Sequence, residues 1–135
     1  MSVKKIEEGV KFSHVTVGNI AGFSGKEFVK ETSGATSCEI SFGSLEAGQV
    51  VPFFHSHKAN EENYIILSGE GKFQVDDTVF GVAEGSVVRV ATNCDRNIEN
   101  TGTIPMVYVC IQATEGSLEG YTMTDAELTQ RENLL

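Results

Sequence analysis

Short apolar runs with a period of two constrain the fold of this chain more than any other feature. Apolar and polar side chains alternate through residues 36–42, and further short β-rich runs occupy 50–54, 64–67, 72–75, 78–80, 87–90 and 104–113. A period of two places alternate side chains on opposite faces of a strand. Strands of this length, separated by Gly, Asn and Asp, are typical of a sandwich or barrel. We therefore predict an all-β domain.

Composition excludes several classes of protein. The 135 residues suffice for one domain with its own core, and 40% of them are apolar. The formal charge of −9 would repel a phosphate backbone, so no nucleic-acid partner is expected. The apolar runs are too short to span a membrane, and the N-terminus lacks the apolar region of a signal peptide. Three cysteines without a Cys-x-x-Cys pattern predict no disulfide framework and a cytoplasmic location.

A histidine pair followed by a carboxylate is the main candidate site. His55 and His57 are two of only three histidines, and their spacing on a strand puts both rings on one face. Glu61 and Glu62 follow after a short loop, and a carboxylate on the next strand would complete a 2-His-1-carboxylate metal site with open positions. Phe53, beside the pair, indicates a buried strand. Spacing alone leaves metal binding and unrelated histidines equally open.

Residues 48–69 resemble the first sequence motif of the cupin superfamily. That motif is a glycine, five residues, His-x-His, three or four residues, Glu, six residues and Gly. Glu62 lies four residues after His57 and seven before Gly69, so it matches the ligand glutamate, whereas Glu61 would point the other way. Six residues rather than five separate the first glycine from His55. The resemblance implies a divalent metal held by the two histidines and Glu62.

Residues 85–100 resemble the second cupin motif in length more than in identity. The first glycine and Asn100 align at the expected distance. Asn93 replaces the turn glycine, and Asn tolerates the left-handed conformation best after Gly. Arg96 stands where the family has its fourth ligand, a histidine. The chain is thus similar to a small single-domain cupin, with a modified second motif.

The resemblance implies a double-stranded β-helix, or jelly-roll, over residues 35–113. Residues 1–34 are expected to add strands and a loop that pack on this barrel, and 114–135 to form a C-terminal segment with a short helix. Pairing of an N-terminal strand with a second chain would cover exposed sheet edges, which predicts a homodimer.

The C-terminal helix is predicted from its capping pattern. Thr124 can be the N-cap and Glu127 the third residue of a capping box, with Met123 and Leu128 at the staple positions. Leucines at 128, 134 and 135 could dock the helix on the barrel. A frayed tail is the alternative.

The arginine in the fourth ligand position leaves three interpretations open. Arginine stays protonated and cannot bind a metal. In the first interpretation, three protein ligands and water hold the metal; in the second, Cys94 or Asp95 substitutes; in the third, the barrel binds its ligand without metal. Nitrogen and oxygen ligands permit Fe, Mn, Co, Ni or Zn.

Arg96 and Tyr64 are the candidate substrate-binding residues. A guanidinium beside a divalent metal would favour a small anionic ligand, because it binds carboxylate and phosphate in a bidentate way. The alternative is that Arg96 pairs with Glu62 or Glu99 and only fills the gap. Tyr64 shares strand parity with Glu62, so it either faces the cavity or packs as a core aromatic.

Two classes of function follow. The first is a metal-dependent enzyme acting on a small anionic molecule, of the dioxygenase or isomerase and epimerase type known for the cupin barrel. The second is a non-catalytic module that binds a small ligand in the same cavity. The fold alone does not decide between them.

Overall fold

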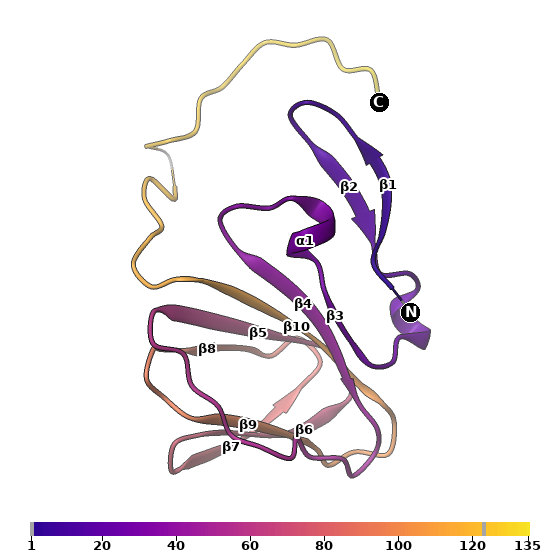
Figure 1. The fold of residues 1–135 in the computed structure, drawn as a ribbon, viewed down its shortest axis with the longest axis vertical. Helices are drawn as coiled ribbons and strands as arrows, with labels where there is room; N and C mark the ends of the chain where they lie inside the picture. Colours follow the sequence, from indigo (N-terminus) through magenta and orange to yellow (C-terminus); the bar gives the residue numbers. More distant parts are fainter. Residues whose placement is uncertain (1, 123) are drawn as a thin grey trace.

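The computed structural model describes residues 2–122 and 124–135, so Met1 and Met123 lie outside the description. The chain is built mainly of short strands (Figure 1). They are β1 (Lys4–Glu8), β2 (Ser13–Thr16), β3 (Lys26–Phe28), β4 (Glu39–Leu45), β5 (Asn60–Ser68), β6 (Glu70–Val75), β7 (Thr78–Ala83), β8 (Val87–Val90), β9 (Arg96–Asn100) and β10 (Met106–Thr114). A 3-10 turn η1 (Ile20–Gly22) and a single-turn helix α1 (Lys30–Ser33) flank β3.

Two antiparallel sheets form the barrel. The larger sheet has the order β3-β4-β10-β5-β8, and the smaller sheet has the order β7-β6-β9. Figure 1 shows the two sheets stacked, with the smaller one below. The runs inferred from the period of two overlap these strands, except residues 50–54, which form no strand; the all-β jelly-roll prediction is confirmed.

The main core lies between the two sheets. Phe73 from β6, Ile66 from β5 and Met106 from β10 are almost fully buried there. Burying a side chain of this size contributes about 1.5–3 kcal/mol to stability. On β10 the inward-facing residues continue with Tyr108 and Cys110, which carries this face from the core toward the open end of the barrel.

Strand β4 packs on both faces, with Leu45 turned into the main core and the partly buried Ile40 and Phe42 turned outward. Ile40 and Phe42 pack against a second core formed by Val17, Phe23, Val29 and Val107. The N-terminal segment thus covers the outer face of the larger sheet. The inward residues of β4 include Ser41 and Gly43, which are small. Because these side chains take little room, the barrel interior next to β4 can hold a cavity.

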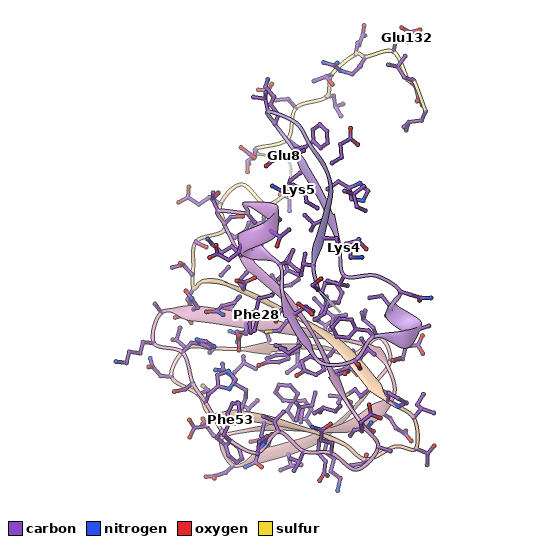
Figure 2. All side chains as sticks on the ribbon, turned by 45° about the vertical axis from the view of Figure 1, so that its right-hand side comes forward. Lys4, Lys5, Glu8, Phe28, Phe53 and Glu132 are labelled. Carbon is purple, nitrogen blue, oxygen red and sulfur yellow. The ribbon has the colours of Figure 1, made fainter. Side chains whose placement is uncertain are left out.

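The β1–β2 hairpin projects away from the barrel (Figure 1). Lys4, Lys5 and Glu8 lie along it (Figure 2), and Lys5 pairs with Glu8 at 3.1 Å. Its apolar residues Ile6, Val10 and Phe12 are exposed. A two-stranded hairpin that buries so little apolar surface is only marginally stable by itself.

The predicted C-terminal helix is wrong. The described residues after β10 contain turns and extended chain only, and Thr124 and Glu127 begin no helix; Met123, the other predicted staple residue, lies outside the described residues. Leu128 and the last two leucines are exposed, so the segment has no apolar face docked on the barrel. A short helix is marginal in water without such packing. Within the described residues, no helix is long and apolar enough to cross a membrane.

Candidate metal centre

The segment that carries the two histidines is held by main-chain bonds to the turn before β9. The Arg96 amide donates to the His55 carbonyl at 3.1 Å, and the Asn93 amide donates to the His57 carbonyl at 2.7 Å. Asn93 has φ = 59°, the left-handed conformation that its place in the motif predicts. The loop before β5 therefore lies alongside the smaller sheet, with alternate side chains, those of the histidines, turned to the barrel interior.

Glu62 reaches the same place from the larger sheet. It lies on β5, opposite Gln112 of β10 and Val90 of β8, and is 5% exposed. Its neighbour Glu61 points away and pairs with Arg89 at 3.1 Å. Strand parity alone thus separates a buried carboxylate from a surface one.

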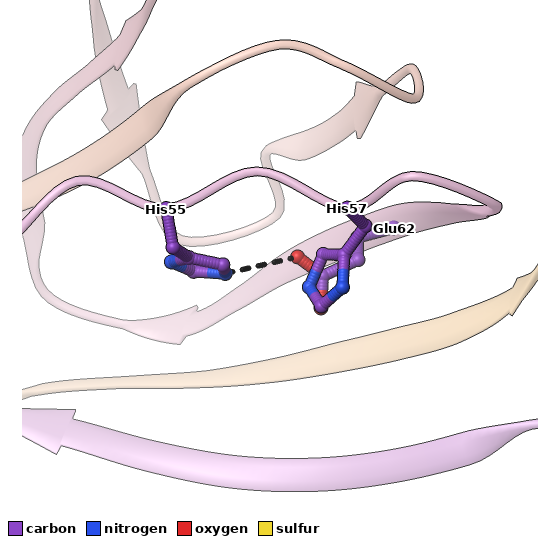
Figure 3. A group of neighbouring side chains, drawn as sticks. All are labelled: His55, His57 and Glu62. Atoms are coloured by element: carbon purple, nitrogen blue, oxygen red, sulfur yellow. Dashed lines mark ion pairs between the residues drawn. The ribbon is translucent and has the colours of Figure 1, made fainter.

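The three predicted ligands converge. His55 Nε2 lies 3.6 Å from Glu62 Oε1, and His57 Nε2 lies 3.3 Å from Glu62 Oε2. One donor atom from each residue lies within 4.8 Å of the other two. Figure 3 shows both rings extending from the same segment toward the carboxylate on the neighbouring strand.

Two further side chains hold the Glu62 carboxylate. The Tyr64 hydroxyl donates to Oε1 at 3.0 Å, and the Cys110 thiol donates to Oε2 at 3.2 Å. Cys110 was not among the residues that the sequence singled out as a site. The only signal was its place on the face of β10 that also carries Tyr108 and Gln112.

The surroundings favour an ionised Glu62 beside a neutral imidazole. Burial alone would raise the pKa of Glu62, but the Cys110 hydrogen bond, nearby His57, the Tyr64 hydrogen bond and Arg96 outweigh it and lower the pKa. Partial burial lowers the pKa of His55, although Glu62 opposes the effect. Burial also raises the pKa of the Cys110 thiol to about 12 and that of Tyr64 further, so both groups stay protonated as donors.

The donor set fits a divalent metal ion. His57 Nε2 is buried and makes no hydrogen bond to any described residue. A buried nitrogen without a partner costs free energy unless a ligand satisfies it. Two imidazole nitrogens and a carboxylate suit Fe, Mn, Co, Ni or Zn, and three protein ligands leave positions open.

Arg96 lies beside the three candidate metal ligands and is not one of them. It is 2% exposed, and its Nη1 and Nη2 donate to the His55 and Ala91 carbonyls, both at 3.4 Å. Its Nε lies 3.8 Å from Glu62 Oε1 without forming a hydrogen bond. Of the two acidic partners considered, Glu62 is therefore the nearby one, whereas Glu99 lines an outer groove.

The two substitute ligands considered for the fourth position do not join the donor group. The Cys94 thiol donates to the Thr92 carbonyl at 3.5 Å. Asp95 is exposed, and its amide donates to Asp76 Oδ1 at 2.9 Å. Among the described residues, the donor group that can hold an ion here consists of the two histidines and Glu62.

A cavity of about 400 Å³ opens from the metal ligands to the surface. Tyr64 and Arg96 line it together with the three ligands. Phe53 and Phe28 lie at its mouth, one above the other in Figure 2. Phe53 is 59% exposed, so the expected burial of its strand is wrong, because the segment around it forms two isolated bridges rather than a strand.

Three polar residues of the cavity wall come from places that the sequence did not single out as a site. Lys26 lies on β3, Glu39 on β4 and Gln112 on β10. The Gln112 side chain accepts from Asn60 Nδ2 at 2.7 Å. Nothing in the local sequence marks Lys26, because its position depends on β3 pairing with β4.

Comparison with known proteins identifies the family. A family model described as a cupin domain matches residues 41–112, more than half of the chain. An uncharacterised protein of Methanocaldococcus jannaschii is 30% identical over 76 residues, which span 56% of this chain and 57% of that protein. The chain thus matches little more than half the length of this curated relative.

Solved structures agree with this assignment. The crystal structure of a cupin protein from Bacteroides fragilis is 35% identical, with a TM-score of 0.82, and the match covers 90% of this chain and 100% of that one. A putative sugar phosphate isomerase from Acidithiobacillus ferrooxidans has a TM-score of 0.61 at 21% identity, covering 73% and 72% of the two chains, and shows a shared fold alone. Since the matched segment runs from β4 to β10 and contains all three converging ligands, the chain belongs to the cupin family.

Proposed function

We propose that this cupin is a metal-dependent enzyme that acts on a small anionic molecule. The observation that carries the proposal is the buried His57 Nε2, which lacks a hydrogen-bond partner among the described residues and faces a carboxylate and a second imidazole. The cavity beside it, about 400 Å³, has the size of a small-molecule site.

The protein residues would act by fixing the ligands. Tyr64 and Cys110 each donate to a different oxygen of Glu62, so the carboxylate cannot rotate freely. Hydrogen bonds of this kind orient metal ligands and raise metal affinity. A bound divalent ion would supply Lewis acidity or redox chemistry at the cavity wall. An isomerase or epimerase and a dioxygenase both fit this arrangement.

The charge of the cavity favours an anionic ligand. Its lining contains two basic residues, Lys26 and Arg96, and two carboxylates, Glu39 and Glu62. These charges balance, so a divalent ion makes the cavity cationic within a chain of net charge −9. A focused positive field attracts small anions. Direct contact of Arg96 and Tyr64 with a substrate stays a prediction, since both side chains donate hydrogen bonds to other protein groups in this structure.

Metal content of histidine variants tests the proposal. The purified protein is stripped with a chelator, reloaded with each candidate metal and analysed for bound ions. We expect about one ion per chain, and loss of most of it in His55→Ala and in His57→Ala. Ser56→Ala is the matched control, because Ser56 lies between the histidines but is exposed. Full metal content in both histidine variants would refute the site.

A turnover screen then separates the two functions. The metal-loaded wild type and His57→Ala are incubated with small carboxylates and phosphates, and products are followed by mass spectrometry. Conversion by the wild type alone supports an enzyme. Tight binding without conversion, in a chain that takes up no metal, would favour the binding module instead.

We also propose that two copies pair through the β1–β2 hairpin. Its residues Ile6, Val10 and Phe12 are exposed, and β1 has a free edge. Sedimentation should give a dimer for the full chain and a smaller species when residues 2–16 are removed. A monomeric full chain would exclude the pairing.

A further inference from the structure

Lys26 reaches the cavity along a cross-strand row that contains a glycine. Lys26 of β3 pairs with Gly43 of β4, and Gly43 pairs with Tyr108 of β10. A Cβ atom at Gly43 would lie 2.6 Å from the Tyr108 ring. The absence of a side chain therefore lets this ring lean over β4 toward Lys26.

The Lys26 ammonium lies among aromatic rings. Its Nζ is 5.2 Å from the Tyr108 ring centroid and 5.4 Å from that of Phe28. Both distances are within the range of a cation–π contact. Lys26 lies on the edge strand and is exposed as a whole, and it lines the cavity together with these two rings.

Within the part of the chain that the structure describes, no carboxylate forms an ion pair with this ammonium within 4.0 Å. Glu39, the acidic group on the same side of the cavity, accepts instead from the amides of Val29 and Lys30. Burial lowers the pKa of Lys26, with Cys110 and Glu62 opposing the effect, so the ammonium is incompletely solvated. Such a group gains most from a bound anion.

We propose that Lys26 binds the anionic group of the substrate while another oxygen of the same molecule reaches the His55, His57 and Glu62 site. The substrate class is a small molecule with a carboxylate or phosphate at one end and a metal-binding oxygen group at the other. Arg96 is less suited to this role, because both of its terminal nitrogens already donate to main-chain carbonyls. The inference rests on the proposed function for the metal end of the molecule only.

Titration with dicarboxylates tests the role of Lys26. Malonate, succinate and glutarate, with propionate as the single-carboxylate comparison, are titrated by calorimetry into wild type, Lys26→Met and Lys26→Arg. Methionine keeps most of the stem and removes the charge. Lys72→Met is the matched control, since Lys72 lies on β6 between two buried residues and is exposed on the outer face. Thermal unfolding of each variant checks that the barrel is intact.

We expect one dicarboxylate to bind the Zn-loaded wild type best, and its affinity to fall about tenfold or more in Lys26→Met. Propionate affinity should change less, because its single carboxylate can bind at the metal. Lys26→Arg should recover part of the loss, and Lys72→Met should match the wild type. Equal dicarboxylate affinity in wild type and Lys26→Met would overturn the inference, as would a wild type that binds none of these anions.

The same titrations on the metal-free proteins separate this inference from the proposed function. If the chain takes up no metal, the proposed function fails, but a weaker dicarboxylate affinity in Lys26→Met than in Lys72→Met still supports the anion site. If metal binds and both variants behave alike, Lys26 is excluded while the metal site stands.

Discussion

The two cupin-like motifs that meet at the candidate metal centre are joined by main-chain hydrogen bonds. They differ in the side chains that they place there. The histidine segment and Glu62 supply three donor atoms, whereas β9 begins with Arg96 in a position where the cupin motif has a fourth histidine. The turn before β9 nevertheless has the left-handed Asn93 that the motif predicts, and main-chain hydrogen bonds join this region to the histidine segment. The main-chain framework around the candidate site is thus present although Arg96 stands at the motif's fourth ligand position.

Replacing Asn100 should show how much the second motif contributes to the stability of this framework. Its side-chain amide donates to the carbonyls of Leu45 and Ile104 at 2.9 and 2.8 Å, and its oxygen accepts from the Gly102 amide at 2.9 Å. Asn100→Ala would remove all three hydrogen bonds and leave the buried Leu45 carbonyl without this partner. We expect the free energy of unfolding in urea to fall by about 3 kcal/mol.

Asn133→Ala is the control for this change, because Asn133 lies in the exposed tail. It should shift the unfolding free energy by less than about 0.5 kcal/mol. Equal stability of the two variants would mean that the second motif has no structural role of its own.

Tyr64→Phe tests the first motif, which supplies the two histidines and Glu62. The change removes the hydroxyl that holds Glu62 Oε1 but leaves the ring packed against Phe73, at 5.0 Å between centroids. We expect metal affinity to fall about tenfold, since loss of a group that orients a ligand typically costs 10–100-fold. A competition titration with a coloured chelator measures it, and Tyr108→Phe serves as the comparison because no hydrogen bond joins Tyr108 to Glu62. An affinity equal to that of the wild type would show that Glu62 is held without Tyr64.

Arg96→His tests the second motif, in which Arg96 stands at the fourth ligand position. A fourth imidazole should raise Zn affinity by about one order of magnitude, because the framework already aims this position at the cavity. Arg96→Met fills the space without a donor and is the control. If Arg96 also anchors the substrate, the histidine variant should lose dicarboxylate affinity as Lys26→Met does; unchanged anion affinity would leave Arg96 as a support for Glu62. Metal affinity no higher than in Arg96→Met would mean that the turn no longer points at the ligands.

Removal of residues 119–135 should have the smallest effect. This tail forms no helix in its described part, and its leucines are exposed. We expect metal affinity to be unchanged and the unfolding free energy to shift by less than about 0.5 kcal/mol. A larger loss would indicate that the tail packs on the barrel in solution.

The strands and the convergence of the ligands could be predicted from sequence, because both depend on local spacing. A period of two determines which side chains share a face, and it correctly separated Glu62 from Glu61. The left-handed Asn93 followed from motif length and from the conformations that Asn tolerates. The helical capping pattern at Thr124 was equally local, but it failed because a short helix also needs a surface to pack on.

The rest of the cavity was decided by which strands became neighbours. Lys26 and Cys110 are 84 positions apart, yet β4 brings their strands into one sheet, and the missing side chain of Gly43 leaves room for the Tyr108 ring to approach Lys26. The outward direction of Ile40 and Phe42 likewise depends on a second apolar layer that the N-terminal segment provides. Spacing along one strand determines the face of a residue, but the partners on that face come from long-range pairing, whose free energy is shared over the whole sheet.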